Sequence, residues 1–476
     1  MNSSVKIVPD DPAELKRLVV DLHQQHEKQV SVLLEQIRHL RQLLFGRRSE
    51  KLPVDSTTVQ LPLFDMPEPE HIEPTKMVVE AHERKKPGRK PLPPELPRVE
   101  IVHDLPEEEK VCACGCQLSR IGEEVSEQLD IVPAKIQVLR HIRPKYACRA
   151  CEGVEDNGPT VRIAPPAPQI IPKSIASPGL LAHVLTGKFV DHLPFYRQEK
   201  MFERLGVDIG RATLCNWAMK AAEACVPLVN LIRDEILEAR VINIDETTVQ
   251  VLAEPGRAPT STSYMWLFRR GDPQRPALIY QYHPTRAGDV AREFLGDFKG
   301  VVQTDGYSGY GFLNHQAGVR HAGCWAHVRR KFMEVIKAQG KNHKSGSADQ
   351  ALATIQQLYA LEKEARRLKL DPGALLALRQ QQARPILNNF HLWLMKRSVQ
   401  TPPKGLLGKA ISYALAQWDR LLVYLDEPML TPDNNLAENA IRPFVLGRKN
   451  WLFAGNPKGA EASALLYSLI ETAKAN

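Results

Sequence analysis

The sequence predicts a multidomain α+β protein with an N-terminal coiled coil, a small cysteine-rich segment, a helix-turn-helix and an α/β core that carries a helical insertion. Three observations lead to this fold class. The chain has 476 residues, whereas a single domain averages roughly 150. Five of its eight cysteines lie between Cys112 and Cys151. After the helical patterns of residues 174–238, the sequence changes to short β-runs from residue 240.

The composition is that of a globular protein, with 43% hydrophobic and 25% charged residues. No stretch approaches about 18 uninterrupted apolar residues, and the first residues lack a basic stretch followed by an apolar run. We therefore expect no membrane span, no secretory signal and a cytoplasmic location. The 63 basic and 55 acidic residues give a net charge of +8, which permits a polyanionic partner. Two basic runs, within 84–98 and 439–460, are compatible with phosphate contact or with solvated surface.

Residues 11–46 predict one helix that forms a coiled coil. Its apolar residues recur at three- and four-residue spacing: Leu15, Val19, Leu22, Val30, Leu33, Ile37, Leu40 and Leu44. So narrow a stripe predicts self-association, and packing of the helix on its own domain is the alternative. Residues 47–99 are basic and rich in proline. A sequence of this composition has too few apolar residues to build a core, so we predict a linker. Contact of its GRKP motif with an A·T-rich minor groove is the alternative there.

Residues 100–160 contain two close groups of cysteines: Cys112, Cys114 and Cys116, then Cys148 and Cys151. In a reducing cytoplasm such clustering favours metal over disulfides. Strand-like text separates the groups, so together they can supply four thiolates to a tetrahedral Zn²⁺ in a closed, structural site. The sequence does not decide which two of Cys112, Cys114 and Cys116 bind the Zn²⁺. We expect the three remaining cysteines to be ordinary buried thiols: Cys215, Cys225 and Cys324.

Residues 174–238 predict three helices, of which the second and third are joined by a turn at Gly206. Two helices with such a turn are typical of a DNA-binding helix-turn-helix, although any helical hairpin gives a similar pattern. The third helix carries four polar residues as candidate DNA contacts: Arg211, Thr213, Asn216 and Lys220. We expect Trp217 to pack between the helices.

Residues 240–330 contain three predicted strands, then an amphipathic helix and a fourth predicted strand. A fifth strand and a basic helix follow. That order is typical of a ribonuclease-H-like core, in which the first strand lies beside the strand that follows the helix. Asp245 on the first strand and Asp305 at the end of the later one would then meet. Buried carboxylates are costly unless they are paired or metal-bound, and a divalent cation relieves their repulsion. Oxygen ligands suit Mg²⁺ or Mn²⁺.

Glu438 is the third expected carboxylate. The text TPDNNLAENAIRP predicts a helix capped by Thr431, begun at Pro432 and ended by Pro443, with Glu438 in its middle. The alternative for each of the three acids is an ordinary surface or capping residue.

The segment between the second and third acids is mostly helical in pattern. We interpret residues 331–430 as a helical insertion, after which residues 431–476 complete the core. Three carboxylates can hold two metal ions about 4 Å apart for phosphoryl transfer. The attacking oxygen can come from water or from a DNA 3′-hydroxyl.

Eight stretches of the chain follow one another in a recognisable order. They are LFGRRSEKL at 44–52, RKPLPPELPRVE at 89–100, SEQLDIVPAKIQVLRHIRPKYACRAC at 126–151, LPFYRQEKMFERLG at 193–206, IDETTVQV at 244–251, TDGYSGY at 304–310, CWAHVRRKF at 324–332 and NNLAENAIRPFVLGRKNWLFAG at 434–455. Together they resemble the IS66 family of transposases, the large TnpC-type proteins of bacterial insertion sequences.

The resemblance implies a coiled coil, a zinc-binding segment, a helix-turn-helix and an Asp-Asp-Glu core. Asp245, Asp305 and Glu438 would be the catalytic residues and would bind Mg²⁺ or Mn²⁺. Six basic residues would hold the DNA backbone: His327, Arg329, Arg330, Arg442, Arg448 and Lys449. For the last three, bracing of their own helix is the alternative.

The resemblance also implies partners and a reaction. The protein would bind double-stranded DNA at the terminal inverted repeats of its element, cleave a phosphodiester at the 3′ end, and join that end to target DNA. It would act as a homo-oligomer through the coiled coil, with helper proteins encoded by the same element, in the cytoplasm and at the nucleoid.

Two departures from the family pattern bear on these expectations. The first zinc pair contains Cys112-Ala-Cys114-Gly115, where the family usually has Cys-x-x-Cys-Gly. The family also normally continues beyond the final YSLIETAKAN. Two alternatives therefore stand beside a transposase: a catalytically silent or truncated DNA-binding regulator, and a ribonuclease-H-like nuclease without strand transfer.

Overall fold

The structure is a computed structural model that describes residues 168–340 and 345–476, together with Pro165, residues 136–147 and 161–163, and scattered positions between Asp11 and Ile37. The chain divides into two compact units, of which residues 61–164 form the smaller one. The five candidate zinc cysteines and the linker 47–99 lie outside the described residues. Within the described part, none of the helices combines the length and apolarity needed to span a bilayer.

The smaller unit contains one short antiparallel hairpin among its described residues. Strand β1 (Lys145–Ala147) pairs with β2 (Val161–Ile163). Residues 136–144, which the sequence predicts as strand-like, contain no regular element. Val138 is 91% exposed, so the alternation there has no buried face to form against.

The predicted coiled-coil region is described only in part. The described positions from Lys16 to Ile37 are helical, and the large apolar residues among them are exposed: Val20, Leu22, Val30, Leu33, Leu34 and Ile37. An exposed apolar stripe is compatible with self-association, which stays a prediction.

Three helices precede the sheet, as the sequence predicts: α2 (Pro178–Phe189), α3 (Phe195–Arg204) and α4 (Arg211–Leu237). Ser177 caps α2 by accepting a hydrogen bond from the Leu180 amide at 3.2 Å. Gly206, at φ 78°, makes the turn between α3 and α4, where a side chain would be strained. Trp217 is buried with residues of all three helices, as expected.

A five-stranded mixed sheet forms the centre of the larger unit, in the order β5-β4-β3-β6-β7. Its strands are β3 (Val241–Gln250), β4 (Thr262–Arg270), β5 (Leu278–His283), β6 (Gly300–Gln303) and β7 (Val319–Ala322). The first three strands pair antiparallel, whereas β3, β6 and β7 pair parallel. The predicted neighbourhood of the first strand and the strand after the helix is therefore confirmed.

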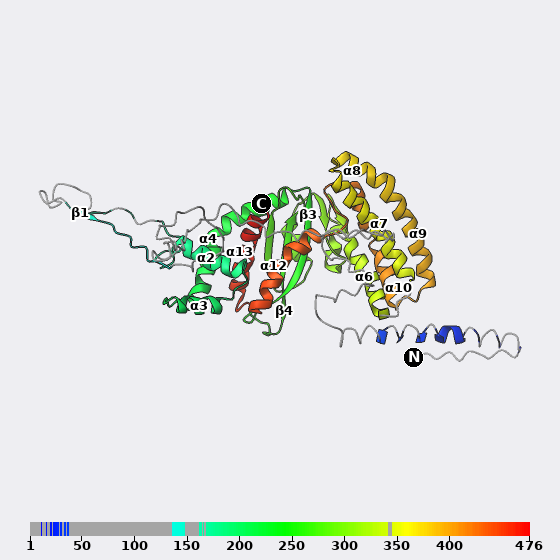
Figure 1. Ribbon diagram of the computed structural model, residues 1–476, viewed down its shortest axis with the longest axis horizontal. Helices are drawn as coiled ribbons and strands as arrows, with labels where there is room; N and C mark the ends of the chain where they lie inside the picture. The colour runs from blue at the N-terminus through cyan, green and yellow to red at the C-terminus, as the bar shows by residue number, and fades with distance from the viewer. Residues whose placement is uncertain are drawn as a thin grey trace, which may run out of the picture. The chain divides into compact units, whose positions relative to one another are not determined.

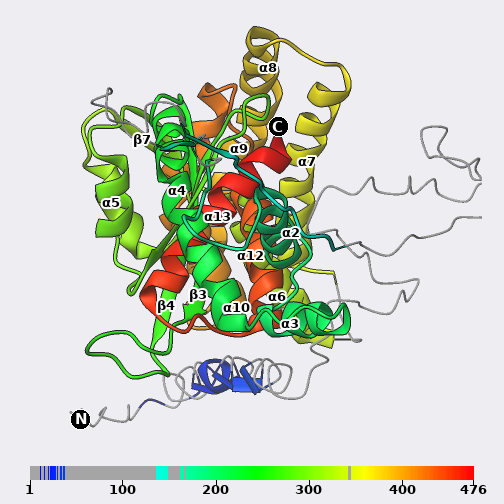
Figure 2. The same cartoon turned by 90° about the vertical axis from the view of Figure 1, so that its left-hand side faces the viewer.

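The two faces of the sheet are covered by different helices. Ile242 and Ile244 of β3 pack with α5 (Asp289–Leu295) and the C-terminal part of α4. Val249 of the same strand packs with α12 (Asn435–Trp451) and α13 (Pro457–Ala475) on the other face. Figure 1 shows α12 lying across the strands, and Figure 2 shows α5 on the opposite side of the sheet from α12 and α13. Because side chains alternate along a strand, Asn243 and Asp245 share the face covered by α12.

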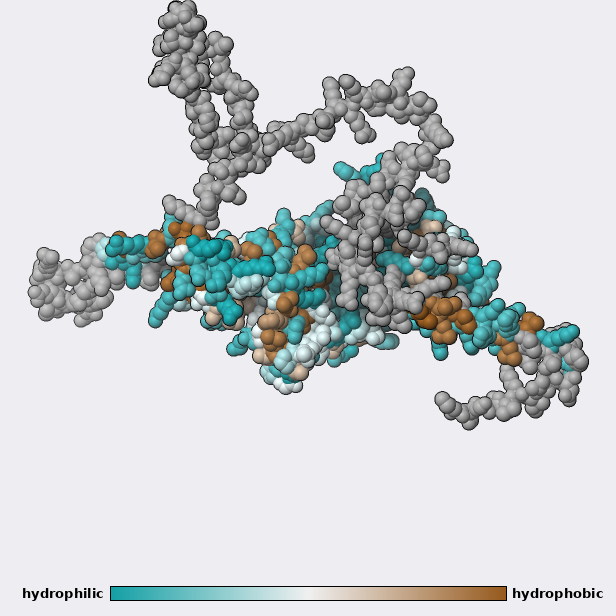
Figure 3. Space-filling model, turned by 60° about the horizontal axis from the view of Figure 1, so that its bottom comes forward, coloured by the Kyte–Doolittle hydropathy of each residue, from teal (hydrophilic) through white to brown (hydrophobic). Residues whose placement is uncertain are grey.

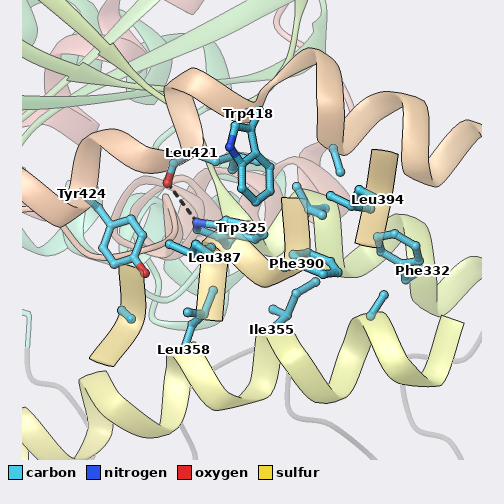
Figure 4. Packing of buried hydrophobic residues seen from close by; sticks show 14 of the residues in the cluster. Trp325, Phe332, Ile355, Leu358, Leu387, Phe390, Leu394, Trp418, Leu421 and Tyr424 are labelled. Atoms are coloured by element: carbon cyan, nitrogen blue, oxygen red, sulfur yellow. Dashed lines mark hydrogen bonds between the residues drawn. The ribbon is translucent and has the colours of Figure 1, made fainter. Parts of the chain in front are cut away.

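A group of helices, called the helical insertion below, lies between β7 and α12 in the chain. Helix α6 (Trp325–Gln339) leads into it and crosses the expected boundary at residue 330 without a break. It continues with α7 (Ser347–Arg367), α8 (Pro372–Leu378), the π-helical segment η4 (Arg379–Ala383), α9 (Arg384–Gln400), α10 (Leu406–Ala416), α11 (Trp418–Leu422) and η5 (Val423–Asp426). Trp325, Phe390 and Trp418 pack in its core, and the Trp325 indole donates to the Leu421 carbonyl at 3.1 Å (Figure 4).

Helix α12 differs from its predicted bounds at both ends. It begins at Asn435 instead of Pro432, because the Thr431 carbonyl accepts from the Gln303 side chain and the Pro432 carbonyl accepts from the Trp325 amide. It also runs through Pro443 to Trp451. The buried side chains on both sides of Pro443, at Ile441 and Phe444, offset the one lost helical hydrogen bond. Glu438 therefore lies in the first turn of the helix and not in its middle.

Small apolar patches lie among polar residues on the face drawn in Figure 3. Leu452 and Phe453, directly after α12, are 65% and 44% exposed. Scattered residues of this kind are normal for a globular protein.

Candidate active site

Strands β3 and β6 bring the first two predicted acids together. The strands are parallel, and Asn243 pairs with Gln303 in their register. Asp245 and Asp305 each follow two residues later, so both carboxylates lie at the same end of neighbouring strands. The Asp305 carboxylate also accepts a hydrogen bond from the Tyr307 amide at 2.9 Å, which orders the chain after the strand.

The pKa of Asp245 responds to the charge of the third predicted acid, Glu438. Its pKa is raised well above the ordinary value, first because burial disfavours the charged form, and then because Glu246, Glu438 and Asp305 place negative charge near it. A hydrogen bond from the Glu246 amide, at 2.9 Å, opposes this rise only in part. The three predicted acids, called the carboxylate cluster below, are thus near enough for the charges of Asp305 and Glu438 to act on Asp245.

Glu438 is held by two basic side chains of α6. Its carboxylate lies 3.0 Å from His327 Nε2 and 3.3 Å from Arg330 Nη2. Burial would raise the pKa of Glu438, but the hydrogen bond from His327 and the charge of Arg330 outweigh it, and the pKa is lowered. The position in the first turn of α12 adds a favourable interaction with the helix dipole.

Cys324 adds a thiol beside this pair. Cys324, His327 and Glu438 offer ligand atoms that lie within 4.8 Å of one another. The Cys324 sulfur accepts a hydrogen bond from the Asn434 amide at 3.2 Å, and burial raises the pKa of the thiol, which keeps it protonated. Cys324 is buried as expected, but its place beside the carboxylates was not predicted. The Cys-x-x-His spacing across the start of α6 is the signal that could have shown it.

The other two cysteines expected to be buried behave differently. Cys225 is half-buried and Cys215 is exposed, so the expectation is wrong for Cys215. Cys215 lies between Leu214 and Asn216 on α4, and only every third or fourth position of a surface helix faces its core.

Glu246 is a buried acid that sequence reasoning missed. It follows Asp245 on β3 and therefore points to the opposite face, where it pairs with Arg286 (Nε to Oε1, 2.6 Å) and accepts from the Tyr310 hydroxyl. The Arg286 guanidinium stacks over the Tyr307 ring, 3.8 Å from its centroid. Strand alternation alone could have separated Glu246 from the carboxylate cluster.

The helical insertion reaches the carboxylate cluster through Tyr413 of α10. A Cβ placed on Gly306, directly after Asp305, would overlap the Tyr413 ring. The insertion therefore packs against the backbone that presents Asp305, and only glycine leaves room for it there.

The residues predicted to contact DNA lie in different settings. Arg211, Thr213, Asn216 and Lys220 are all exposed on the N-terminal half of α4, and Lys220 pairs with Glu223 at 2.9 Å. Arg448 of α12 donates to the hydroxyls of Thr247 and Thr248 on β3, at 3.2 and 2.9 Å. Arg329 and Arg442 are half-buried, whereas Lys449 is exposed.

His321 on β7 makes the stability of the folded state depend on pH. Its ring contacts Thr304 Oγ1 at 2.8 Å and Asn314 Oδ1 at 3.1 Å. Burial, with a smaller contribution from Arg420, lowers the pKa of His321 from 6.5 to about 3. The folded state binds fewer protons than the unfolded state, so its stability is complete above pH 6.5 and is lost as the pH falls toward 3.

We therefore predict that stability decreases by up to about 1.4 kcal/mol per pH unit below roughly pH 6, and that His321→Asn flattens this dependence. Thermal unfolding at several pH values between 7 and 4.5 measures it. Parallel pH profiles of the parent and the variant would contradict the prediction.

Comparison with known proteins covers most of the chain. A family model described as "Transposase IS66 family" matches residues 173–462. A second, "zinc-finger binding domain of transposase IS66", matches residues 109–152, and a third, "Transposase C of IS166 homeodomain", matches residues 32–101.

Among the relatives, "Uncharacterized protein y4jD" of Sinorhizobium fredii is 33% identical, over 98% of this chain and 90% of that protein. From the same organism, "Uncharacterized protein y4qI" is 34% identical over 82% of this chain and 73% of that protein.

Proposed function

The chain belongs to the IS66 transposase family, and we propose that it cleaves DNA at the ends of its element and joins them to target DNA through Asp245, Asp305 and Glu438. The observation that carries the proposal is that Asp245 and Asp305 follow neighbouring parallel strands, with Glu438, in the first turn of α12, near enough to raise the pKa of Asp245. Glu438 follows Asp305 by 133 residues, so local sequence does not account for its position near the other two acids.

We also propose that the core is ribonuclease-H-like. Its support is the sheet, with three antiparallel strands followed by two parallel strands and with the first strand beside the strand after helix α5. The helical insertion then separates the second acid from the third.

The cluster suits divalent cations such as Mg²⁺ or Mn²⁺. All three side chains offer hard oxygen ligands. Burial and the neighbouring acids raise the pKa of Asp245, and a bound cation would relieve the cost of ionising this carboxyl group. When bound, such cations would activate the attacking oxygen and stabilise the leaving oxygen of the phosphodiester. The protein holds Asp245 and Asp305 on strand ends, and it holds Glu438 between His327 and Arg330.

We propose that DNA is contacted by helix α4 and by basic residues of α6 and α12. We propose that the exposed face of α4 contacts the inverted repeats as the second helix of a helix-turn-helix. Its candidate DNA contacts are Arg211, Thr213, Asn216 and Lys220. His327, Arg329, Arg330, Arg442, Arg448 and Lys449 would contact DNA phosphates once DNA enters. The match to a zinc-finger domain at residues 109–152 supports a zinc site built from four of the five clustered cysteines. Self-association through residues 11–46 and helper proteins complete the proposal.

The decisive experiment combines cleavage and joining. The purified chain is incubated with labelled element-end DNA and a target plasmid in Mg²⁺ or Mn²⁺, and we expect nicked ends and joined products that EDTA abolishes. Cleavage without joined products would favour a nuclease. End binding that persists without any metal-dependent cleavage would favour a DNA-binding regulator.

A further inference from the structure

Three buried amide side chains form a hydrogen-bonded network next to the residues that carry the three acids. Asn243, Gln303 and Asn434 are 1%, 0% and 2% exposed. Asn243 Nδ2 donates to Gln303 Oε1 at 2.8 Å and to Asn434 Oδ1 at 2.9 Å. The three amides thus connect β3, β6 and the residue before α12, the same three elements that carry the acids.

The hydrogen-bond pattern defines the orientation of each amide. Gln303 Nε2 donates to the carbonyls of Gly323 and Thr431, at 3.2 and 2.9 Å, so its oxygen faces Asn243. Asn434 Nδ2 donates to the Ile244 carbonyl at 2.8 Å, so its oxygen also faces Asn243. Asn243 must therefore present its NH₂ group to two acceptors, which no apolar residue and no carboxylate can do.

Each amide is close in sequence to one acid. Asn243 precedes Asp245 by two residues, and Gln303 precedes Asp305 by two residues. The Asn434 carbonyl accepts from the Glu438 amide at 3.1 Å, so Asn434 also anchors the turn that carries the third acid. A shift of any amide would move the acid attached to it.

The interior position makes these polar groups unusual. Buried amides gain little net stability over apolar residues of the same shape, and a partly satisfied network is unfavourable. Asn243 Oδ1 indeed meets no hydrogen-bond donor within the described part of the chain. What the network provides and apolar packing cannot is a directional connection between elements 60 and 191 residues apart.

We propose that Asn243, Gln303 and Asn434 are positioning residues that set the separation of Asp245, Asp305 and Glu438 for divalent-cation binding. This inference rests on the proposed function, because it assigns the metal to those acids. Groups that orient ligands typically change metal affinity or activity by roughly 10–100-fold when they are removed.

The test uses Asn243→Leu and Gln303→Met in the full chain, since both keep the approximate shape and add no charge. Mn²⁺ binding is measured by calorimetry, and the Mn²⁺ concentration for half-maximal end cleavage is measured in parallel. We expect both quantities to indicate roughly 10–100-fold weaker Mn²⁺ binding, with end-DNA affinity unchanged.

Gln198→Met is the matched control. Gln198 is also buried, and its Nε2 donates to two carbonyls, those of Val184 and Leu193, each at 3.2 Å, but it lies between α2 and α3. We expect it to lower the thermal midpoint as Gln303→Met does while its Mn²⁺ affinity stays at the parental value. If Asn243→Leu fails to fold, Gln303→Met decides the question.

The outcomes separate the two proposals. If the parent binds Mn²⁺ and cleaves, and the variants match its Mn²⁺ affinity, the positioning role is overturned while the proposed function stands. A parent that neither binds Mn²⁺ nor cleaves overturns both.

Discussion

Asp245→Asn is expected to lower end cleavage by on the order of 10³-fold or more, because it removes a negatively charged oxygen from the centre of the carboxylate cluster. The amide has the same shape as the carboxylate, so the strand pairing of β3 with β4 and β6 should survive. The rate of strand cleavage on element-end DNA in saturating Mn²⁺ measures the effect.

The same substitution should raise the thermal stability of the metal-free protein. The folded-state pKa of Asp245 lies above its unfolded value, so the folded state loses stability as the pH rises through that folded-state pKa. Asparagine cannot ionise and removes this loss. A higher unfolding midpoint in EDTA at pH 8, together with lost cleavage, is the expected pair of results.

Asp289→Asn is the control for both measurements. Asp289 is exposed on α5, where it pairs with Arg292 at 2.7 Å, and it lies outside the cluster. It should cleave as the parent does. Asp245→Asn protein that cleaves at the parental rate would disprove the proposed mechanism.

Arg379→Met is expected to destabilise the helical insertion by about 3–5 kcal/mol, because it leaves a buried carboxylate without its partner. Arg379 is 2% exposed and binds Glu362 of α7 through two hydrogen bonds, at 2.7 and 2.8 Å. Its remaining donors reach the carbonyls of Tyr424, Glu427 and Leu430, at 2.7 to 2.9 Å. All five guanidinium donors are therefore used.

Urea unfolding followed by tryptophan fluorescence measures this loss, since Trp325 and Trp418 lie in the insertion core. The double variant Arg379→Met with Glu362→Leu should recover part of the stability, because the unpaired charge is removed as well. Arg367→Met breaks an exposed pair with Glu364 on the same helix α7 and should leave the midpoint unchanged. Equal effects of Arg379→Met and Arg367→Met would contradict the prediction.

The strands and the meeting of two acids could be predicted because their signals are local. Alternating apolar text marks β3, and the order of strands and helix places Asp245 beside Asp305. Glu438 could be predicted as the third acid because a helical pattern surrounds it. The acids' surroundings could not, since His327 and Arg330 reach Glu438 across more than 100 residues.

The start of α12 shows why local signals failed there. Thr431 and Pro432 have the residue types of a helix start, and by propensity the prediction was reasonable. However, the carbonyls of Thr431 and Pro432 accept hydrogen bonds from Gln303 and Trp325. These tertiary hydrogen bonds move the start of the helix by three residues, to Asn435. No sequence window that contains Thr431 also contains either partner.

The helical insertion has a consequence for the timing of synthesis. Asp245 and Asp305 emerge from the ribosome well before Glu438, which follows Asp305 by 133 residues. At about 5–20 residues per second, that interval lasts roughly 7–27 seconds. A nascent chain can pair β3 with β6 during this time, but it holds only two of the three acids. The carboxylate cluster is completed after the insertion has been made, so a chain interrupted within the insertion contains helices α2, α3 and α4 without a complete cluster.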